Sequence, residues 1–412
     1  MRDPLAATTD GYWLNDAVHR AYLIRDALRQ LDFFDASLGA KTGLVTLDFA
    51  GKPLPGAQEL ITTTRLTHSY GLAQIAGRRD GAGIIDRGMA DLWHRHRDKG
   101  HGGYAWAVDQ AGVTDGVKLA YGHVFVLLAA ATAKQAGHPE ADRLLADVSE
   151  IIDRHYWDKD AGLLRDEFTQ DWQAFSTYRG MNANMHGVEA MLTAYEATGE
   201  ALYLSRARSI LDFFVGRIAP AENWRLPEHY TQDWQVDRVY EGNPMFRPAG
   251  STPGHSFEIA RLLLQMWDLS GRVGTDAPIA ARRLIGQALA DAWHAERGGL
   301  VYTLAVDGTV ARSARYWWPV TEAIGAIAVL IKLDPQPQDE IWYRRLWQFA
   351  DDHLIDHARG GWFPELSDTN AVAMAQFTGK PDIYHALQAE LFPLVSGTSR
   401  FSSALAADRP LA

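Results

Sequence analysis

Ionisable side chains recur at a regular spacing along this chain of 412 residues. They stand 55 to 69 residues apart, each near the expected start of an apolar helix, at His68, His123, His186, His255, Glu322 and His385. A helix N-terminus disfavours the charged imidazolium, and a neutral imidazole is a general base near pH 7. If these six helix starts meet in space, their side chains line one site suited to proton transfer at a carbon beside a carbonyl group.

Carboxylates and an arginine accompany the histidines. Glu189 and Glu258 each follow a histidine by three residues, which places each on the same helix face as that histidine. Each can orient its imidazole or bind a hydroxyl group of a substrate. Arg65 precedes His68 by one helical turn, and an arginine on a largely buried helix requires polar partners. These residues predict a polar floor to the site.

The segment GSTPGHSFEIARLLL shows how His255 is placed. Ser251 or Thr252 can cap a helix, Pro253 suits its first position, and Gly254 allows a close approach of another group. The apolar stripe that follows predicts a helix, so the histidine lies in its first turn.

Structural roles could explain some of the histidines, including two of these six. His68 and His123 are equally well explained as packing residues. His94 and His96, in the charged segment DLWHRHRD, are expected on a solvated helix face.

A glycine-containing loop repeats along the chain. Its six copies are anchored at Gly43, Gly103, Gly162, Trp224, Gly299 and Gly361. They are 59 to 75 residues apart, and the β-branched and aromatic residues around each turn predict a short β-hairpin. Amphipathic helices are expected before the loops, as at 15–34, 141–157 and 339–355. Helices that are apolar all round are expected after them, as at 120–137, 184–199 and 321–333.

Six helix pairs of this kind predict an all-α fold. A helix that is apolar all round is buried, and an amphipathic one faces water on one side. The pattern therefore predicts an (α/α)6 barrel of two concentric rings, with the short β-hairpin loops on one face. An open α-solenoid is the alternative, but six units fill nearly the whole chain without a polar capping repeat. We expect a single domain over 1–412, with its core at about 11–395 and a C-terminal tail at 396–412.

The composition excludes several classes of partner. The net charge is −11 without a basic block, which argues against nucleic acid or an anionic membrane. The chain has no cysteine, so disulfides, thiolate nucleophiles and cysteine-ligated metals are excluded. The first residues contain no apolar signal-type segment, and the apolar stretch at 323–333 is too short to span a bilayer. A cytoplasmic protein is expected.

Other chemistries fit the pattern less well. The His186–Glu189 and His255–Glu258 pairs could ligate a metal, but neither has the HExxH spacing and no Asp-rich ion loop is present, so we expect no metal. A glycosidase needs a pair of carboxylates, whereas most of the converging positions are histidines. No P-loop or GxGxxG motif indicates a nucleotide site.

Four segments, in order along the chain, resemble the N-acylglucosamine 2-epimerase superfamily and, within it, the branch of aldose–ketose isomerases. They are RGMNANMHGVEA at 179–190, AGSTPGHSFEIARLLL at 249–264, RYWWPVTEAIGA at 315–326 and KPDIYHALQ at 380–388. The resemblance extends from about residue 10 to about residue 395. It implies an (α/α)6 barrel and an isomerase that works through a cis-enediol(ate) without a cofactor or a metal.

The resemblance also implies roles for individual residues. His255 and His385 match the acid/base pair: His385 would move the proton between C2 and C1, and His255 would assist ring opening and proton transfer at oxygen. Substrate-binding positions of the family match Arg65, Tyr121, Asn182, His186, Glu258, Trp318 and Glu322. Further candidates are Arg247, Glu189 and His68.

The expected substrate is a neutral sugar. Members that act on a sulfonated sugar carry glutamines where this chain has Pro364 and Pro381, and proline has no side-chain donor. With the acidic net charge, this favours D-mannose and D-fructose, with D-lyxose and D-xylulose as a side reaction. The alternatives are a 2-epimerase acting on mannose and glucose or on the reducing end of a disaccharide, a sulfoquinovose isomerase, an inverting glycosidase, and a sugar-binding protein without catalysis. The oligomeric state is left open.

Overall fold

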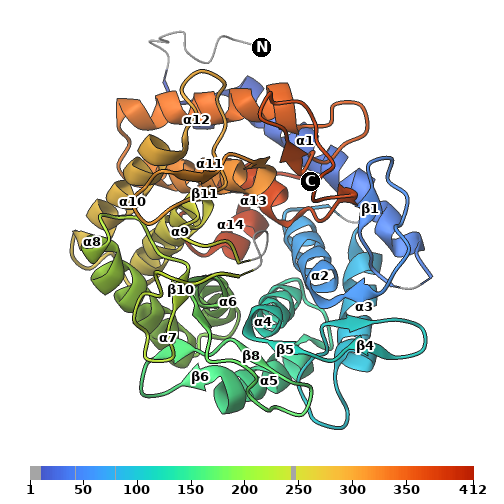
Figure 1. The fold of residues 1–412 in the computed structure, drawn as a ribbon. Coiled ribbons are helices and arrows are strands. Elements are labelled where there is room, and N and C mark those ends of the chain that lie inside the picture. Colours follow the sequence, from blue (N-terminus) through green and yellow to red (C-terminus); the bar gives the residue numbers. More distant parts are fainter. Residues whose placement is uncertain (1–10, 42, 79, 243–246) are drawn as a thin grey trace.

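The computed structural model describes residues 11–41, 43–78, 80–242 and 247–412. Two concentric rings of helices surround a central axis (Figure 1). The outer ring consists of α1 Ala17–Phe34, α3 Ala82–Asp91, α5 Ala141–Ile151, α7 Ala201–Leu211, α10 Asp276–Ala292 and α12 Pro337–Phe349. The inner ring consists of α2 Leu60–Ile75, α4 Ala120–Gln135, α6 Met181–Thr198, α9 Pro253–Leu269, α11 Trp317–Leu333 and α13 Tyr384–Leu394. The predicted all-α barrel of six helix pairs is confirmed.

Contacts between the first and last inner helices close the ring. Each inner helix packs on the next, from α2 through α4, α6, α9, α11 and α13, and α13 packs back on α2. The loops of the first and last repeats are also joined, because β1 (Leu47–Asp48) pairs antiparallel with β15 (Gly379–Lys380). An open solenoid has neither of these contacts, so the structure excludes that alternative.

Burial separates the two rings as the sequence predicts. Residues 122–133 of α4 and 319–331 of α11 are buried on every side. The outer helices keep an exposed face. Four of the outer helices run on into π-helical turns, at Leu92–His96, Ile152–Tyr156, Asp212–Ile218 and Ala350–Leu354.

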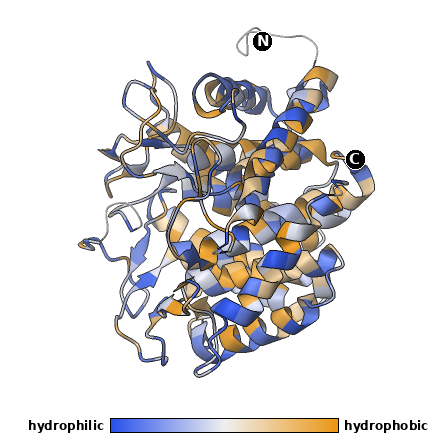
Figure 2. Cartoon of the chain, turned by 90° about the vertical axis from the view of Figure 1, so that its right-hand side faces the viewer, coloured by the Kyte–Doolittle hydropathy of each residue, from blue (hydrophilic) through white to orange (hydrophobic). Residues whose placement is uncertain are grey.

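The remaining helices are short. They are two 3₁₀ turns at Trp13–Asn15 and Asp35–Gly39, α8 Ala219–Ala221 and α14 Phe401–Asp408. In α14, Leu405 is fully buried, and the ring of Phe401 packs on Phe392 of α13 with the centroids 4.4 Å apart. The C-terminus lies away from the strands (Figure 2). Over the part of the chain that the structure describes, no helix combines the length and the apolar character that a membrane span requires.

Strands of two or three residues gather at one end of the barrel (Figure 2). Besides β1 and β15 they are β2 Gln58–Glu59, β3 Ala107–Val108, β4 Val113–Asp115, β5 Lys118–Leu119, β6 Trp157–Asp158, β7 Leu163–Leu164, β8 Glu167–Phe168, β9 Arg179–Gly180, β10 His229–Tyr230, β11 Thr303–Leu304, β12 Val310–Arg312, β13 Arg315–Tyr316 and β14 Glu365–Leu366. β3–β4, β6–β7 and β11–β12 are hairpins within single loops, as predicted for the copies at Gly103, Gly162 and Gly299. In the copies at Gly43, Trp224 and Gly361, the strands β1, β10 and β14 pair with other repeats instead. β2–β3, β5–β8, β9–β10 and β13–β14 instead join neighbouring repeats.

Backbone carbonyls of these loops fix the starts of four inner helices. The first N–H groups of α2, α4, α6 and α11 donate to the carbonyls of Trp106, Asp166, Glu228 and Pro364, at 2.8, 2.7, 3.0 and 3.3 Å. Each acceptor belongs to the loop of the following repeat. Because the first N–H groups of a helix have no partner within it, these bonds position the first turns on which the site is built.

Candidate active site

His255 is the third residue of α9 and lies at the strand-bearing end of the barrel. Pro253 occupies the first helical position, as predicted, but the predicted side-chain cap is wrong. Ser251 lies in a β-bridge with Leu304, and Thr252 stands at the N-cap position without a side-chain bond. Nδ1 of His255 is 2.8 Å from Oε1 of Glu228. A carboxylate oxygen accepts, so this contact requires a proton on Nδ1 and leaves Nε2 outside the pair.

His385, the second residue of α13, has a similar partner. Its Nδ1 lies 2.8 Å from Oε1 of Glu322 on α11. The other oxygen of Glu322 accepts from Arg261 at 3.0 Å. Burial alone would raise the pKa of Glu322, but Arg261 and the hydrogen bond with His385 together lower it below its ordinary value. Each of the two histidines is therefore paired through Nδ1 with a glutamate from another element.

The indole of Trp318 lies beside both imidazoles. Its centroid is 5.0 Å from that of His255 and 5.9 Å from that of His385, with the planes inclined by 32° and 35°. The indole also packs on the backbone of α9, because a Cβ added at Gly254 would lie 2.3 Å from the Trp318 ring. The close approach predicted at Gly254 is confirmed, and its partner is this tryptophan.

Three buried glutamates surround the guanidinium of Arg261. Its Nη2 lies 3.0 Å from Glu322, 3.8 Å from Glu258 and 3.9 Å from Glu189. Burial and the neighbouring carboxylates raise the pKa of Glu258 well above its ordinary value. Burial would also raise the pKa of Glu189, but the nearby His186 and the charge of Arg261 lower it. The cluster thus favours a protonated Glu258 beside ionised neighbours.

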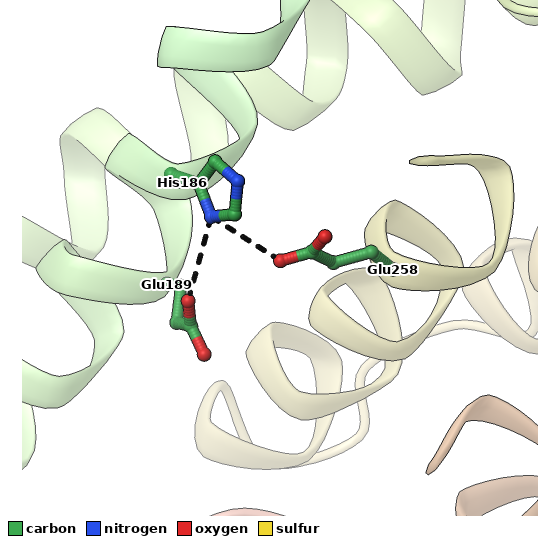
Figure 3. A group of neighbouring side chains, drawn as sticks. All are labelled: His186, Glu189 and Glu258. Atoms are coloured by element: carbon green, nitrogen blue, oxygen red, sulfur yellow. Dashed lines mark ion pairs between the residues drawn. The ribbon is translucent and has the colours of Figure 1, made fainter. Parts of the chain in front are cut away.

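His186 projects from α6 toward two of these carboxylates (Figure 3). Its Nδ1 is 3.3 Å from Oε1 of Glu258 and 3.7 Å from Oε2 of Glu189. Mainly through burial, the pKa of His186 is lowered to about 4. The imidazole is therefore neutral near pH 7, and its Nδ1 has no hydrogen-bond partner among the described residues.

Arg65 of α2 is held rigidly near the same cluster. Its Nη1 donates to Asp382 at 2.7 Å, and its Nη2 donates to the hydroxyl of Tyr121 at 2.8 Å. The guanidinium also lies over the rings of Phe125 and Tyr384, 4.7 and 4.9 Å from their centroids. Tyr121 contacts His186 edge-on, with the ring centroids 5.3 Å apart. A cation fixed in this way can stabilise an oxygen on which negative charge develops.

The chain matches a known family over most of its length. The model of the N-acylglucosamine 2-epimerase (GlcNAc 2-epimerase) family matches residues 43–389. The chain belongs to the N-acylglucosamine 2-epimerase family. A protein named D-mannose isomerase from Thermobifida fusca is 39% identical over 402 residues, which cover 96% of this chain and 98% of the relative. A second D-mannose isomerase, from Pseudomonas cannabina pv. alisalensis, is 37% identical over 404 residues, covering 96% and 97%.

Solved structures of similar proteins have the same fold. A crystal structure of D-mannose isomerase superposes with a TM-score of 0.85 at 31% identity and covers 91% of this chain and 97% of its own. Cellobiose 2-epimerase from Spirochaeta thermophila superposes with a TM-score of 0.81 at 23% identity, with 91% and 95% covered, and shares the fold.

In this N-acylglucosamine 2-epimerase family member, the six aligned ionisable residues do not lie at one level. His255 and His385 are the third and second residues of their helices, but His186 and Glu322 are the sixth, and His68 is the ninth. The expectation that all six stand in first turns is wrong. For α2, α4, α6 and α11, bonds from the following repeat, rather than the local sequence pattern, set where the helix begins.

The geometry gives His68 and His123 structural explanations. Nδ1 of His68 lies 2.7 Å from the hydroxyl of Thr132, and burial lowers the pKa of His68 to about 4. Nε2 of His123 accepts from the N–H of Tyr104 at 3.0 Å, and its Nδ1 lies 2.8 Å from the carbonyl of Leu119. His123 therefore joins α4 to the neighbouring hairpin and lies outside the site.

The expected solvated face at His94 and His96 is half right. His94 is exposed, but His96 is fully buried, with Nδ1 3.1 Å from the carbonyl of Ala105 and Nε2 3.4 Å from the hydroxyl of Thr63. The prediction is wrong for His96 because this residue ends the π-helical turn Leu92–His96, and a π turn shifts the helix register.

Two other predicted site residues, Asn182 and Arg247, lie nearer the loops than the cluster around Arg261 does. Asn182 is the second residue of α6 and half-buried, and its Oδ1 has no hydrogen-bond partner among the described residues. Arg247 donates to Glu167 at 2.6 Å and lies over the ring of Tyr178, 4.1 Å from its centroid. These contacts of Arg247 are with the loops.

Two groups of side chains have the composition of a metal site. They are His186, Glu189 and Glu258, and Glu258, Glu322 and His385. Arg261 lies within 4 Å of all three glutamates, so a fixed cation already stands where a divalent ion would neutralise them. The donor set therefore does not favour a resident metal.

Four residues of the site were not predicted from the sequence: Glu228, Arg261, Asp382 and Tyr384. Arg261 follows Glu258 by three residues, and a buried arginine in an apolar helix is itself a signal of a polar site. Asp382 and Tyr384 precede the last histidine by three residues and by one in the segment KPDIYHALQ. Glu228 lies in a loop, in the weakest copy of the repeat, and no local pattern indicates it.

Proposed function

We propose that this protein interconverts D-mannose and D-fructose. The observation that carries the proposal is the pair His255 and His385, which come from different helices, lie beside the one indole of Trp318 and each have a glutamate on Nδ1. Two such imidazoles can take and return protons at adjacent atoms of one sugar. The relatives named D-mannose isomerase, 39% and 37% identical over nearly the whole chain, support this substrate.

In the proposed reaction, His385 acts at carbon. Its Nε2 takes the C2 proton of open-chain mannose, the C2–H electrons form the C1–C2 double bond, and the carbonyl oxygen at C1 takes up negative charge. His255 assists ring opening and moves protons at oxygen, so that O1 gains a proton as O2 loses one. Return of the proton from His385 to C1 then gives fructose. The reaction is balanced without a redox partner.

The groups around His186 would stabilise the enediolate. The C2 proton of a sugar is very weakly acidic, so its removal requires donors placed where charge develops. Arg65 supplies a fixed cation, and the protonated form favoured for Glu258 can donate a hydrogen bond. Tyr121, Asn182, Trp318, Glu189 and Glu322 complete the proposed binding set. The proposal includes a neutral sugar as substrate and a cytoplasmic location.

A sugar 2-epimerase is the alternative within the same family. It would use the same two histidines but return the proton to the opposite face of C2. The test is to incubate the EDTA-treated protein with D-mannose and follow the early products. Fructose as the first product supports the proposal. Glucose as the first and dominant product, or no turnover by folded protein, would contradict it.

A further inference from the structure

Glu228 lies where two inner helices begin. Its backbone carbonyl accepts from the first N–H of α6, at Met181, and its own N–H donates to the carbonyl of Gly250, both at 3.0 Å. The residue is therefore fixed on both sides by backbone bonds. Its side chain is 5% exposed and reaches His255 on α9.

The backbone position of Glu228 does not require a carboxylate. Trp106, Asp166 and Pro364 occupy the equivalent place in other repeats and offer the same carbonyl to an inner helix. The side-chain carboxyl group of Asp166 accepts from the backbone N–H of Gly180 at 2.9 Å. Of the two acidic residues at this place, only Glu228 forms an ion pair with a histidine in the described structure. Its carboxylate therefore needs a separate explanation.

The two glutamate–histidine pairs differ in their surroundings. Glu322 shares its charge between His385 and Arg261. Among the described residues, neither an arginine nor a lysine forms an ion pair with Glu228. An imidazolium forms at His255 whenever that imidazole accepts a proton. The charge of Glu228 is not shared with an arginine, so it attracts this imidazolium more strongly than Glu322 attracts one at His385.

We propose that Glu228 is a positioning residue that holds His255 with its proton on Nδ1 and its Nε2 turned toward the sugar oxygens, and that stabilises the imidazolium formed there. The inference rests on the proposed function, because it gives a reason for the role of His255 at oxygen. A residue that orients a catalytic histidine mainly affects the chemical step.

The variant Glu228→Gln keeps the shape of the side chain and removes its charge. We expect kcat for mannose to fall by about 10²-fold or more, with KM changing much less, because the imidazole loses its fixed tautomer while the binding groups stay in place. Asp166→Asn is the matched control at the equivalent place, since its carboxyl contacts a backbone N–H rather than a histidine. This control should keep the kcat of the parent protein.

A spectroscopic measurement separates positioning from general damage. In protein labelled with ¹⁵N-histidine, the signals of His255, one of 15 histidines, are assigned by their loss in His255→Gln. The proposal predicts a proton on Nδ1 and a bare Nε2 in the parent protein and in Asp166→Asn, and a changed tautomer in Glu228→Gln. A proton on Nε2 with none on Nδ1 in the parent protein would overturn the proposal, and so would unchanged His255 signals in Glu228→Gln.

The spectrum also keeps this inference distinct from the choice of substrate. If the parent protein leaves mannose unchanged, yet His255 carries its proton on Nδ1 and loses that state in Glu228→Gln, the positioning role is supported while the proposed function fails. If Glu228→Gln does not fold, the spectrum of the parent protein still tests the proposal. A His255 with its proton on Nε2 and none on Nδ1 would show that it does not donate to Glu228.

Discussion

At the scale of the residue, the pKa values of neighbouring carboxyl groups are shifted in opposite directions. Glu258 and Glu322 are both buried beside Arg261, yet the pKa of Glu258 is raised and that of Glu322 is lowered. The difference lies in their partners: Glu322 receives hydrogen bonds from Arg261 and His385, whereas neither oxygen of Glu258 has a hydrogen-bond partner among the described residues. Residue type alone does not reveal such a division.

Glu258→Gln should become more stable relative to the parent protein as the pH rises. Above about pH 4.5, the unfolded chain ionises Glu258 while the folded chain keeps it protonated, so the unfolded state binds fewer protons and the stability contributed by this group falls with pH. Glutamine does not titrate. The difference in Tm between variant and parent should therefore grow from pH 5 to pH 8. A difference that shrinks over this range would show that Glu258 ionises readily.

Glu322→Gln should behave in the opposite sense. Because the pKa of Glu322 is lowered, its ionised form stabilises the folded state above the ordinary pKa of 4.5, and this stability is lost as the pH falls through the folded pKa. Loss of the charge leaves Arg261 and His385 without their anion, at a cost of about 3–5 kcal/mol in the free energy of unfolding at pH 7. Urea denaturation at pH 7 measures this cost, and equal stabilities of variant and parent would contradict the account.

At the scale of the element, the helices were easier to predict than the loops. The apolar run at 120–137 corresponds to α4, Ala120–Gln135, because burial on all sides leaves a local signature. The pairing of strands between repeats, as in β5–β8, leaves none. The depth of His68 was mispredicted for the same reason, since bonds from another repeat decide where the helices begin. The role of Glu228 could not be predicted from the sequence, because its partner His255 lies on a different element.

The start of α9 gives a test at this scale. In Gly254→Ala the new Cβ would lie 2.3 Å from the indole of Trp318 and would push that ring away from His255 and His385. We expect kcat to fall by at least about tenfold, since misplacement by about 1 Å can cost 10²-fold. Steady-state kinetics on mannose measures the effect.

Gly286→Ala in α10 is the matched control. A Cβ at Gly286 meets nothing within 4 Å, so this variant should keep its activity and gain about 0.5–1 kcal/mol of stability from the better helix former. Activity of Gly254→Ala equal to that of this control would contradict the role given to the Gly254–Trp318 contact.

At the scale of the whole molecule, the ring is closed laterally by α13 on α2 and is packed against α14 away from the strands. A cavity of about 40 Å³ lies between α14 and the acidic cluster, and its lining includes His68, Glu189, Arg261, Phe401 and Ser402. The segment 396–412, expected from the sequence only as a tail, thus packs against the inner helices beneath the proposed catalytic groups.

Leu405→Ala tests the contribution of α14 to stability. Leu405 is fully buried, so its truncation should lower the free energy of unfolding by about 2–5 kcal/mol. Leu202→Ala, at a leucine that is 56% exposed on α7, should change it by less than about 0.5 kcal/mol. Urea denaturation of both variants makes the comparison. Similar small effects would mean that α14 does not belong to the cooperative fold.

In the proposed reaction, His385 moves a proton between C2 and C1 through an enediol, while His255 moves protons at oxygen. The most direct test is to convert D-mannose in D₂O with EDTA-treated protein and to locate deuterium by NMR. We expect fructose whose C1 carries deuterium to the extent that the proton on His385 exchanges with D₂O before it returns, and no such product from His385→Asn. Deuterium at carbons other than C1 and C2, or equal turnover by His385→Asn, would contradict this mechanism.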